Sequence, residues 1–129
     1  MTLIQTLTNI VGKSHVLTRP AQMERFTHGY RFGQGRALAV VEPATLLEYW
    51  QVLKACVSAD VVIICQASNT GLTGGSTPTD TDRDTVVISV MRMKGIRLIN
   101  HAEQVVCLPA STLNELEQKL APHGREPHS

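Results

Sequence analysis

The chain has 129 residues, of which 43% are hydrophobic and only 4% aromatic, and its formal net charge is +1. This size and composition predict one globular domain with an aliphatic core and argue against a disordered chain. Since Lys and Arg form no cluster, the sequence disfavours binding to nucleic acid or to an acidic membrane surface.

The N-terminus and the cysteines both indicate a cytoplasmic chain. The first residues lack the basic and apolar regions of a signal peptide, and no apolar run approaches the ~18 residues that a membrane span needs. We therefore expect a soluble chain without a membrane span. Cys56, Cys65 and Cys107 are odd in number and lack C-x-x-C spacing, so we expect buried, reduced thiols.

The N-terminal part of the chain predicts two helices. In Thr2–Val11 the apolar residues recur at i, i+4, i+7 and i+8, which places them on one helical stripe. Thr2 and Gln5 form a capping-box pattern, and Gly12 is a suitable C-terminal stop. Ala21–His28 is compatible with a second, shorter helix.

The middle of the chain predicts a strand, a helix and a strand. Ala37–Val41 is a short apolar run, Thr45 and Glu48 give a second capping-box pattern, and the helix that they begin ends near Ala59. Val61–Gln66 is β-branched and apolar, which is typical of a strand covered on both faces. This order is a βαβ unit, so we expect the two strands to be parallel. The expected apolar face of the helix consists of Leu46, Leu47, Trp50, Leu53 and Val57.

The C-terminal third predicts further strands and a last helix. Thr85–Val90 is a β-branched strand, and Ile96–Asn100 and Gln104–Leu108 form a hairpin or enter the sheet separately. A helix begins near Ser111 or Thr112, presents Leu113, Leu116 and Leu120, and ends at Pro122 and Gly124. The predicted fold class is α/β or α+β, with a small, mainly parallel sheet flanked by helices.

The loop after Gln66 is the most informative stretch of the sequence. Residues 67–76 read Ala-Ser-Asn-Thr-Gly-Leu-Thr-Gly-Gly-Ser and follow a strand, where ligands of open α/β sheets bind. Short side chains allow close approach to the main chain, and glycines allow consecutive N–H groups to converge on an anion. The stretch contains no Lys or Arg, so dipoles would hold a phosphate. An ordinary surface turn is an equally good interpretation of this composition.

Other candidate motifs fail on spacing. Gly75 is followed by Ser76 instead of the Lys of a Walker A loop, and Gly33-x-Gly35 precedes a strand and lacks a third glycine. The alternating Asp80, Asp82 and Asp84 lack the glycine and glutamate of a calcium loop. The histidines lack metal-ligand spacing, so no metal site is predicted. They are His15, His28, His101, His123 and His128, and the last two lie where sequence beyond Ser129 could complete a site.

Several segments together resemble a flavoprotein family. The loop resembles the first FAD-pyrophosphate loop of vanillyl-alcohol oxidase and p-cresol methylhydroxylase type flavoproteins. The flanking segments also occur in that family's order: Val40-Val41-Glu42-Pro43 before the loop, then residues 86–93 and Leu108-Pro109 after it. More narrowly, four segments are similar to the respiratory, quinone-linked D-lactate dehydrogenases. They are Gly33-Gln34-Gly35, residues 53–57, residues 69–73 and residues 124–129.

The resemblance implies a cofactor, a reaction and a set of contacts. It implies that the chain is the N-terminal portion of an FAD-binding domain and that D-lactate passes a hydride to flavin, from which the electrons reach quinone. The base, the second flavin-binding segment and the membrane-contacting part would lie beyond Ser129, so we expect no catalytic residue here and negligible turnover. The whole enzyme would then be peripheral on the cytoplasmic side of the inner membrane. The implied contacts with the FAD pyrophosphate, through main-chain N–H and hydroxyl groups, are Ala67, Ser68, Asn69, Thr70, Gly71, Gly75 and Ser76.

Two departures from the family leave alternatives open. Ala110 stands where a Pro-Gly pair is usual, and the chain ends before the glycine-rich segment that would complete the cofactor site. One alternative is a non-catalytic module that binds no flavin and forms a homodimer through exposed apolar surface. Another is an FAD oxidoreductase for a different hydroxyacid, alcohol or sugar derivative.

Overall fold

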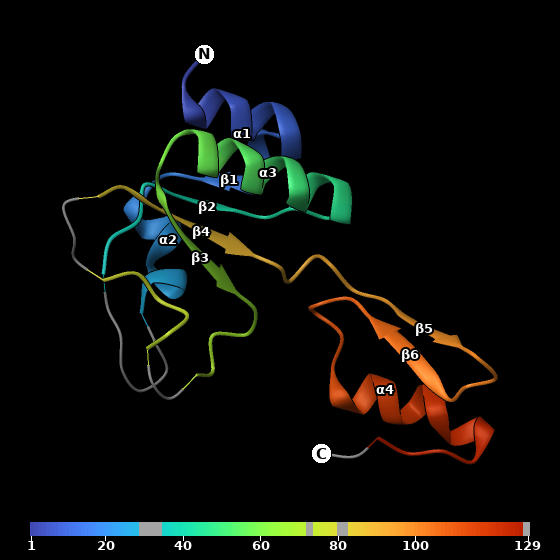
Figure 1. Cartoon of the computed structure of the whole chain (residues 1–129). Helices are drawn as coiled ribbons and strands as arrows, with labels where there is room; N and C mark the ends of the chain where they lie inside the picture. Colours follow the sequence, from blue (N-terminus) through green and yellow to red (C-terminus); the bar gives the residue numbers. More distant parts are fainter. Residues whose placement is uncertain (29–34, 72–73, 80–82, 128–129) are drawn as a thin grey trace. The chain divides into compact units, whose positions relative to one another are not determined.

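The computed structural model describes residues 1–28, 35–71, 74–79 and 83–127 (Figure 1). The chain divides into two compact units, Met1–Arg92 and Met93–Ser129, and each is considered by itself. The sequence predicted one domain with a single core, whereas each unit has its own sheet.

The first unit is built on a four-stranded sheet in the order β1-β2-β4-β3. Its strands are β1 (Val16–Leu17), β2 (Ala39–Val41), β3 (Val62–Gln66) and β4 (Thr85–Ser89). β2 and β3 both pair parallel with β4, whereas β1 pairs antiparallel with β2. The mainly parallel sheet is therefore confirmed, but β4 lies between the two strands of the predicted βαβ unit. β1 was not predicted, because two residues are too few to show a pattern.

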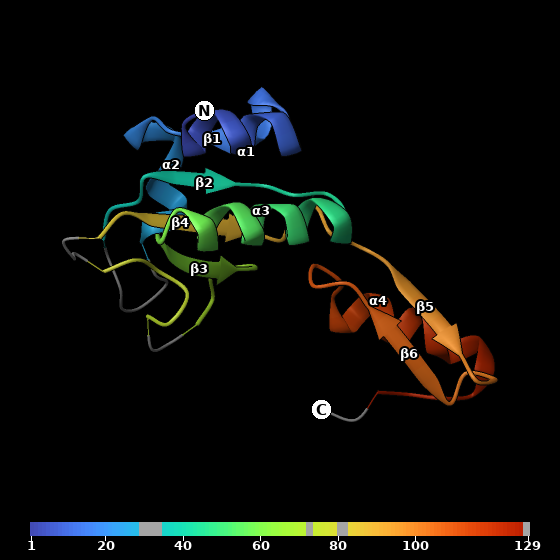
Figure 2. The same ribbon diagram turned by 45° about the horizontal axis from the view of Figure 1, so that its top comes forward.

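Helices cover both faces of this sheet. α1 (Leu3–Val11) and α3 (Leu46–Ser58) lie together on one face, and α2 (Pro20–Thr27) lies on the other (Figures 1 and 2). Along β4, Val86 and Ile88 pack in the cluster with α1 and α3, while Val87 packs in the cluster with α2. All three side chains are completely buried. Packing on both faces of β4 therefore fixes the position of the sheet edge at which this inner strand ends.

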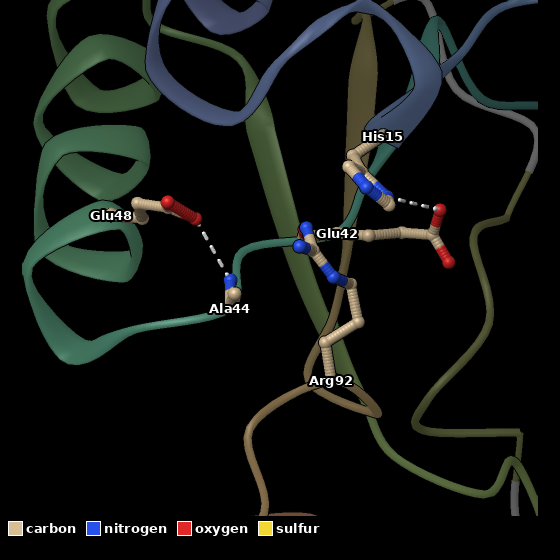
Figure 3. Close-up of polar contacts among 5 residues, drawn as sticks. All are labelled: His15, Glu42, Ala44, Glu48 and Arg92. Atoms are coloured by element: carbon tan, nitrogen blue, oxygen red, sulfur yellow. Dashed lines mark hydrogen bonds and ion pairs between the residues drawn. The ribbon is translucent and has the colours of Figure 1, made fainter.

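Local hydrogen bonds explain where the helices begin. The Thr2 hydroxyl accepts from the Gln5 N–H at 3.2 Å and the Gln5 side chain accepts from the Thr2 N–H at 2.8 Å, so this capping box is confirmed. A 3-10 helix, Lys13–His15, follows α1. At α3, Thr45 accepts from the Glu48 N–H at 3.1 Å. The Glu48 carboxylate accepts instead from the Ala44 N–H at 2.9 Å (Figure 3), one residue before the predicted position.

The predicted core face of α3 is wrong. α3 contacts α1 and the sheet along the line of Val52 and Cys56, both completely buried, with Tyr49 and Leu53 at its margin. Four of the five residues assigned to the core face are 54–69% exposed, because they lie on other sides of the helix. They are Leu46, Leu47, Trp50 and Val57.

Two further expectations about burial are met only in part. β3 is an edge strand and most of its residues are only partly buried. Ile63 packs against the cluster with α1 and α3 and Ile64 against the cluster with α2, so both faces of β3 are covered in part. Cys65, on β3, and Cys107 are exposed, and of the three free cysteines Cys56 is the buried one.

The second unit is a hairpin with a helix. β5 (Ile96–Ile99) and β6 (Gln104–Cys107) pair antiparallel in a sheet of their own, so the hairpin is the correct one of the two predicted alternatives. α4 (Leu113–Leu120) begins with a capping box at Thr112 and continues into a 3-10 helix, Ala121–His123, before Gly124 in the left-handed conformation. Ala110, the residue that departs from the family, is buried, and its N–H donates to Met93 O at 2.9 Å.

Candidate cofactor site

A hollow of about 320 Å³ lies at the edge of the sheet where the parallel strands end. Because β2, β3 and β4 run in the same direction, their carboxyl ends share this edge, as expected for a ligand site in an α/β sheet. The predicted loop leaves β3 at this point. The residues of the hollow considered below are Arg25, Glu42, Gln66, Ala67, Ser68, Asn69 and Ser89.

Asn69 anchors the loop to the end of α2. Its amide nitrogen Nδ2 donates to His28 O at 2.6 Å and to Arg25 O at 3.3 Å, and its Oδ1 accepts from the Ser76 hydroxyl at 2.9 Å. Its backbone has φ 57°, a left-handed conformation that asparagine tolerates better than most residues. The side chains of Asn69 and Ser76 therefore hold the loop, which leaves the Asn69 main-chain N–H for a ligand.

Gln66 is a second anchor, and the sequence analysis did not single it out. It is the last residue of β3, it is only 2% exposed, and its Nε2 donates to Phe26 O and to Ser76 O, both at 2.8 Å. A lone amide in an apolar strand has to find partners inside the protein. Together, Gln66 and Asn69 connect β3, the end of α2 and Ser76.

The first half of the loop presents main-chain donors without protein partners. Within the described residues, the N–H groups of Ala67, Ser68, Asn69, Thr70 and Gly71 donate to no backbone or side-chain group. Ala67, Ser68 and Asn69 line the hollow, while Thr70 and Gly71 are exposed beside it. A run of unpaired N–H groups is suited to an anion, since such groups are rarely left without an acceptor.

The second half of the loop turns back toward β4. Gly74 has φ 78°, and its carbonyl accepts from both the N–H (3.3 Å) and the hydroxyl (3.0 Å) of Thr77. Gly75, predicted to contact the cofactor, is exposed on this turn. Leu72 and Thr73 of the predicted loop lie outside the described residues.

Gly35 packs closely against the segment behind the loop. A Cβ atom at this position would lie 2.6 Å from the carbonyl carbon of Pro78 and 2.9 Å from Thr79 Cα, which is too close for any side chain. Its N–H donates to Thr27 O at 3.2 Å. Gly33 and Gln34 of the same motif lie outside the described residues.

Among the described residues, two charged side chains line the hollow, one of each sign. The Arg25 guanidinium lies 4.5 Å from the centre of the Phe26 ring. The Glu42 carboxylate lies 3.7 Å from His15 Nδ1, and Arg92 donates to the Glu42 carbonyl at 2.6 Å (Figure 3). The loop sequence suggested that dipoles alone would hold a phosphate, but α2 brings a cation to the hollow.

Ser89 places a buried hydroxyl at the hollow. It ends β4, is 1% exposed, and its Oγ has no hydrogen-bond partner among the described residues. A buried polar group without a partner costs free energy and calls for an explanation. The sequence signal was a lone polar residue at the end of an apolar strand, as at Gln66.

A separate polar contact joins α3 to β3. The Tyr49 hydroxyl and Cys65 Sγ are 3.0 Å apart, and this hydrogen bond, with burial, raises the pKa of Tyr49 to about 12. Burial and the nearby Cys65 raise the pKa of the Cys56 thiol to about 11. Both groups stay protonated at neutral pH.

The structure gives no support to metal binding in the part of the chain that it describes. No group of three His, Cys, Asp or Glu residues there could hold an ion. Asp80, Asp82 and His128 lie outside the described residues. No helix within the described ranges is long and apolar enough to cross a membrane.

Comparison with known proteins identifies the class. The FAD binding domain family matches residues 37–128, which is more than half of the chain. The chain therefore belongs to the FAD binding domain family, and FAD is the cofactor. Solved structures agree on the fold: an alkyldihydroxyacetonephosphate synthase superposes with a TM-score of 0.81 at 19% identity, and p-cresol methylhydroxylase with 0.75 at 16%. Each superposition covers 95% of this chain and about a quarter of the other, 25% and 24% respectively.

Curated relatives with higher sequence identity belong to a narrower group of enzymes. The quinone-dependent D-lactate dehydrogenase of Haemophilus influenzae is 63% identical over 98% of this chain, and that of Escherichia coli is 54% identical over 98%. The chain spans 23% and 22% of the length of these two relatives.

Proposed function

We propose that the chain supplies the diphosphate-binding part of an FAD-dependent D-lactate dehydrogenase that uses quinone as its electron acceptor. The reaction converts D-lactate and quinone into pyruvate and quinol, so two electrons and two protons change carriers. Bound FAD supplies the hydride acceptor. This chain contributes binding and orientation, and it has negligible turnover by itself, since the relatives are more than four times its length.

One observation carries the cofactor part of the proposal. Five consecutive main-chain N–H groups, from Ala67 to Gly71, have no acceptor within the described residues, and three of these residues line the hollow at the strand ends. A diphosphate offers several anionic oxygens to such donors. The predicted contacts at Gly75 and Ser76 remain part of the proposal, with the Ser76 hydroxyl acting mainly through Asn69.

The substrate and the acceptor are transferred from the relatives, and the location is inferred from the acceptor. Three curated relatives that are 47–63% identical to this chain are quinone-dependent D-lactate dehydrogenases. Because quinone resides in the membrane, we place the whole enzyme on the cytoplasmic face of the inner membrane as a peripheral protein.

A hybrid enzyme tests the proposal directly. The chain replaces the matching segment of the Haemophilus influenzae relative, and the purified hybrid is assayed for bound FAD and for D-lactate-dependent reduction of a quinone analogue. We expect stoichiometric FAD, and turnover within about tenfold of the parent enzyme.

Three controls make the hybrid experiment decisive. L-lactate should give no turnover, and Gly71→Val should reduce bound FAD, because its side chain would enter the space beside the unpaired N–H groups. The 129-residue chain alone should give no turnover. A well-folded hybrid that contains no FAD would refute the proposed function, and one that contains FAD but oxidises a different hydroxyacid would refute the substrate.

A second candidate function is self-association without flavin, as a homodimer. Its supporting observation is the exposed apolar surface of α3, with Trp50 54% exposed beside a groove of about 770 Å³ between α1 and α3. Sedimentation of the chain with and without Trp50→Gln tests this candidate. Leu113→Gln, at a residue of α4 that is 55% exposed, is the matched control. A monomer at micromolar concentration would exclude the homodimer.

A further inference from the structure

Building on the proposed function, we propose that Arg25 and Ser89 complete the FAD diphosphate site. Ser89 supplies a buried hydroxyl donor, and Arg25 supplies the positive charge that the loop sequence lacks. Neither residue lies in the loop, which spans residues 67–76. They reach the hollow from the end of β4 and from α2.

Ser89 is suited to a ligand because the protein provides it with no partner. Its Oγ is buried and unpaired within the described residues, and the side chain lines the hollow. β4 is an inner strand of the sheet, and the two residues that precede Ser89, Val87 and Ile88, are completely buried, so the position of Ser89 is fixed. An acceptor oxygen in the hollow would satisfy the hydroxyl without moving the backbone. A diphosphate supplies such an oxygen.

Arg25 is held at the hollow by its neighbours. Its guanidinium stacks on Phe26, a buried residue that is 5% exposed and packs in the cluster with Val40 and Val87. Its carbonyl accepts from Asn69 Nδ2, so the residue is tied to the loop whose N–H groups are unpaired. This stacking restricts a long side chain before any ligand binds and so reduces the entropy lost on binding.

The charge balance of the hollow favours an anion near Arg25. Glu42 is the opposing charge, and its carboxylate lies near His15 on β1's side, 3.7 Å from Nδ1. Arg92 lies on the same side and donates to the Glu42 carbonyl. Glu42 therefore has contacts of its own, with His15 at its carboxylate and Arg92 at its carbonyl. Within the described residues no ion pair joins it to Arg25, which is left to interact with a ligand beside Ala67, Ser68 and Asn69.

Ser89→Ala tests the buried hydroxyl. Apoprotein of the hybrid enzyme is titrated with FAD, and we expect the Kd to rise roughly tenfold, as for a lost hydrogen bond to a charged group. Urea unfolding of the 129-residue chain should show no loss of stability, because the substitution removes an unpaired buried group. Thr85→Val, at the opposite end of β4, is the matched control and should leave the Kd unchanged.

Arg25→Gln tests the charge. We expect the Kd for FAD to rise roughly tenfold to a hundredfold at low salt, with a weaker dependence of the Kd on ionic strength. Arg25→Lys should recover part of the affinity. Arg83→Gln is the control, since Arg83 pairs with Asp60 at 3.2 Å near the amino ends of β3 and β4.

The outcomes separate this inference from the proposed function. If the unsubstituted hybrid binds no FAD, the proposed function fails, and the inference fails with it. If the hybrid binds FAD, and Ser89→Ala and Arg25→Gln both bind FAD with the same Kd as the unsubstituted hybrid, only this inference is overturned. A raised KM for D-lactate with an unchanged Kd for FAD would also overturn it, because it would assign Arg25 to the substrate.

Discussion

The isosteric substitution Asn69→Asp should loosen the cofactor loop without changing its shape. Asp tolerates the left-handed conformation and retains an acceptor for Ser76, but its second oxygen would face two carbonyls, those of Arg25 and His28. Two hydrogen bonds are lost, each worth about 1 kcal/mol, and an oxygen pair 2.6 Å apart adds repulsion. Because the site is partly open to water, we expect the free energy of unfolding to fall by about 2–3 kcal/mol.

Urea unfolding of the chain measures this loss, with Ser76→Ala as the comparison. Ser76→Ala removes one hydrogen bond, from Oγ to Asn69 Oδ1, so it should cost about 1 kcal/mol. If the free energy of unfolding of Asn69→Asp is within 0.5 kcal/mol of that of the unsubstituted chain, the inference that this side chain anchors the loop is wrong.

Four further predictions concern two glycines, a buried thiol and a helix start. Gly71→Ala should change the free energy of unfolding by less than about 0.5 kcal/mol, since its Cβ would meet only a hydroxyl at 3.8 Å, yet it should weaken FAD binding to the hybrid. Gly35→Ala should lower the free energy of unfolding by about 1–3 kcal/mol, because its Cβ would clash with the backbone of Pro78. Because burial raises the pKa of Cys56 to about 11, the unfolded chain loses this proton first, so stability should fall between pH 9 and 11. Urea unfolding at pH 9 and at pH 11 should show a smaller fall in the free energy of unfolding for Cys56→Ala than for the unsubstituted chain. Glu48→Ala should cost about 1 kcal/mol in the same assay.

The elements that were predicted correctly have local causes. The capping box at Thr2 and the hairpin of β5 and β6 involve residues close together in the sequence, so their patterns are complete without the fold. The core face of α3 failed for the opposite reason. Leu46 and Trp50 satisfy the helical period as well as Val52 and Cys56 do, and only the position of α1 and the sheet decides which set is buried.

The candidate site shows the same division. The loop could be located from Ala67 to Ser76, because its composition and its place after a strand are local properties. The anchoring role of Asn69 could not be predicted, since its partners are 41 and 44 residues earlier in the chain. Arg25 was missed for the same reason, whereas Ser89 carried a signal in its own strand.

The hydrogen bonds of the loop separate the residues that hold its shape from those that face a ligand. Gln66, Asn69 and Ser76 use their side chains on the protein, and this keeps the N–H groups of the first half of the loop free of internal acceptors. Donors that are fixed in advance lose little entropy when an anion arrives, so rigidity in the first set contributes affinity in the second. Substitutions in the first set should therefore change stability and binding together, whereas Ser89→Ala and Gly71→Ala should change binding alone. This difference distinguishes a preformed anion site from an ordinary surface turn, in which no substitution would affect FAD affinity without affecting stability.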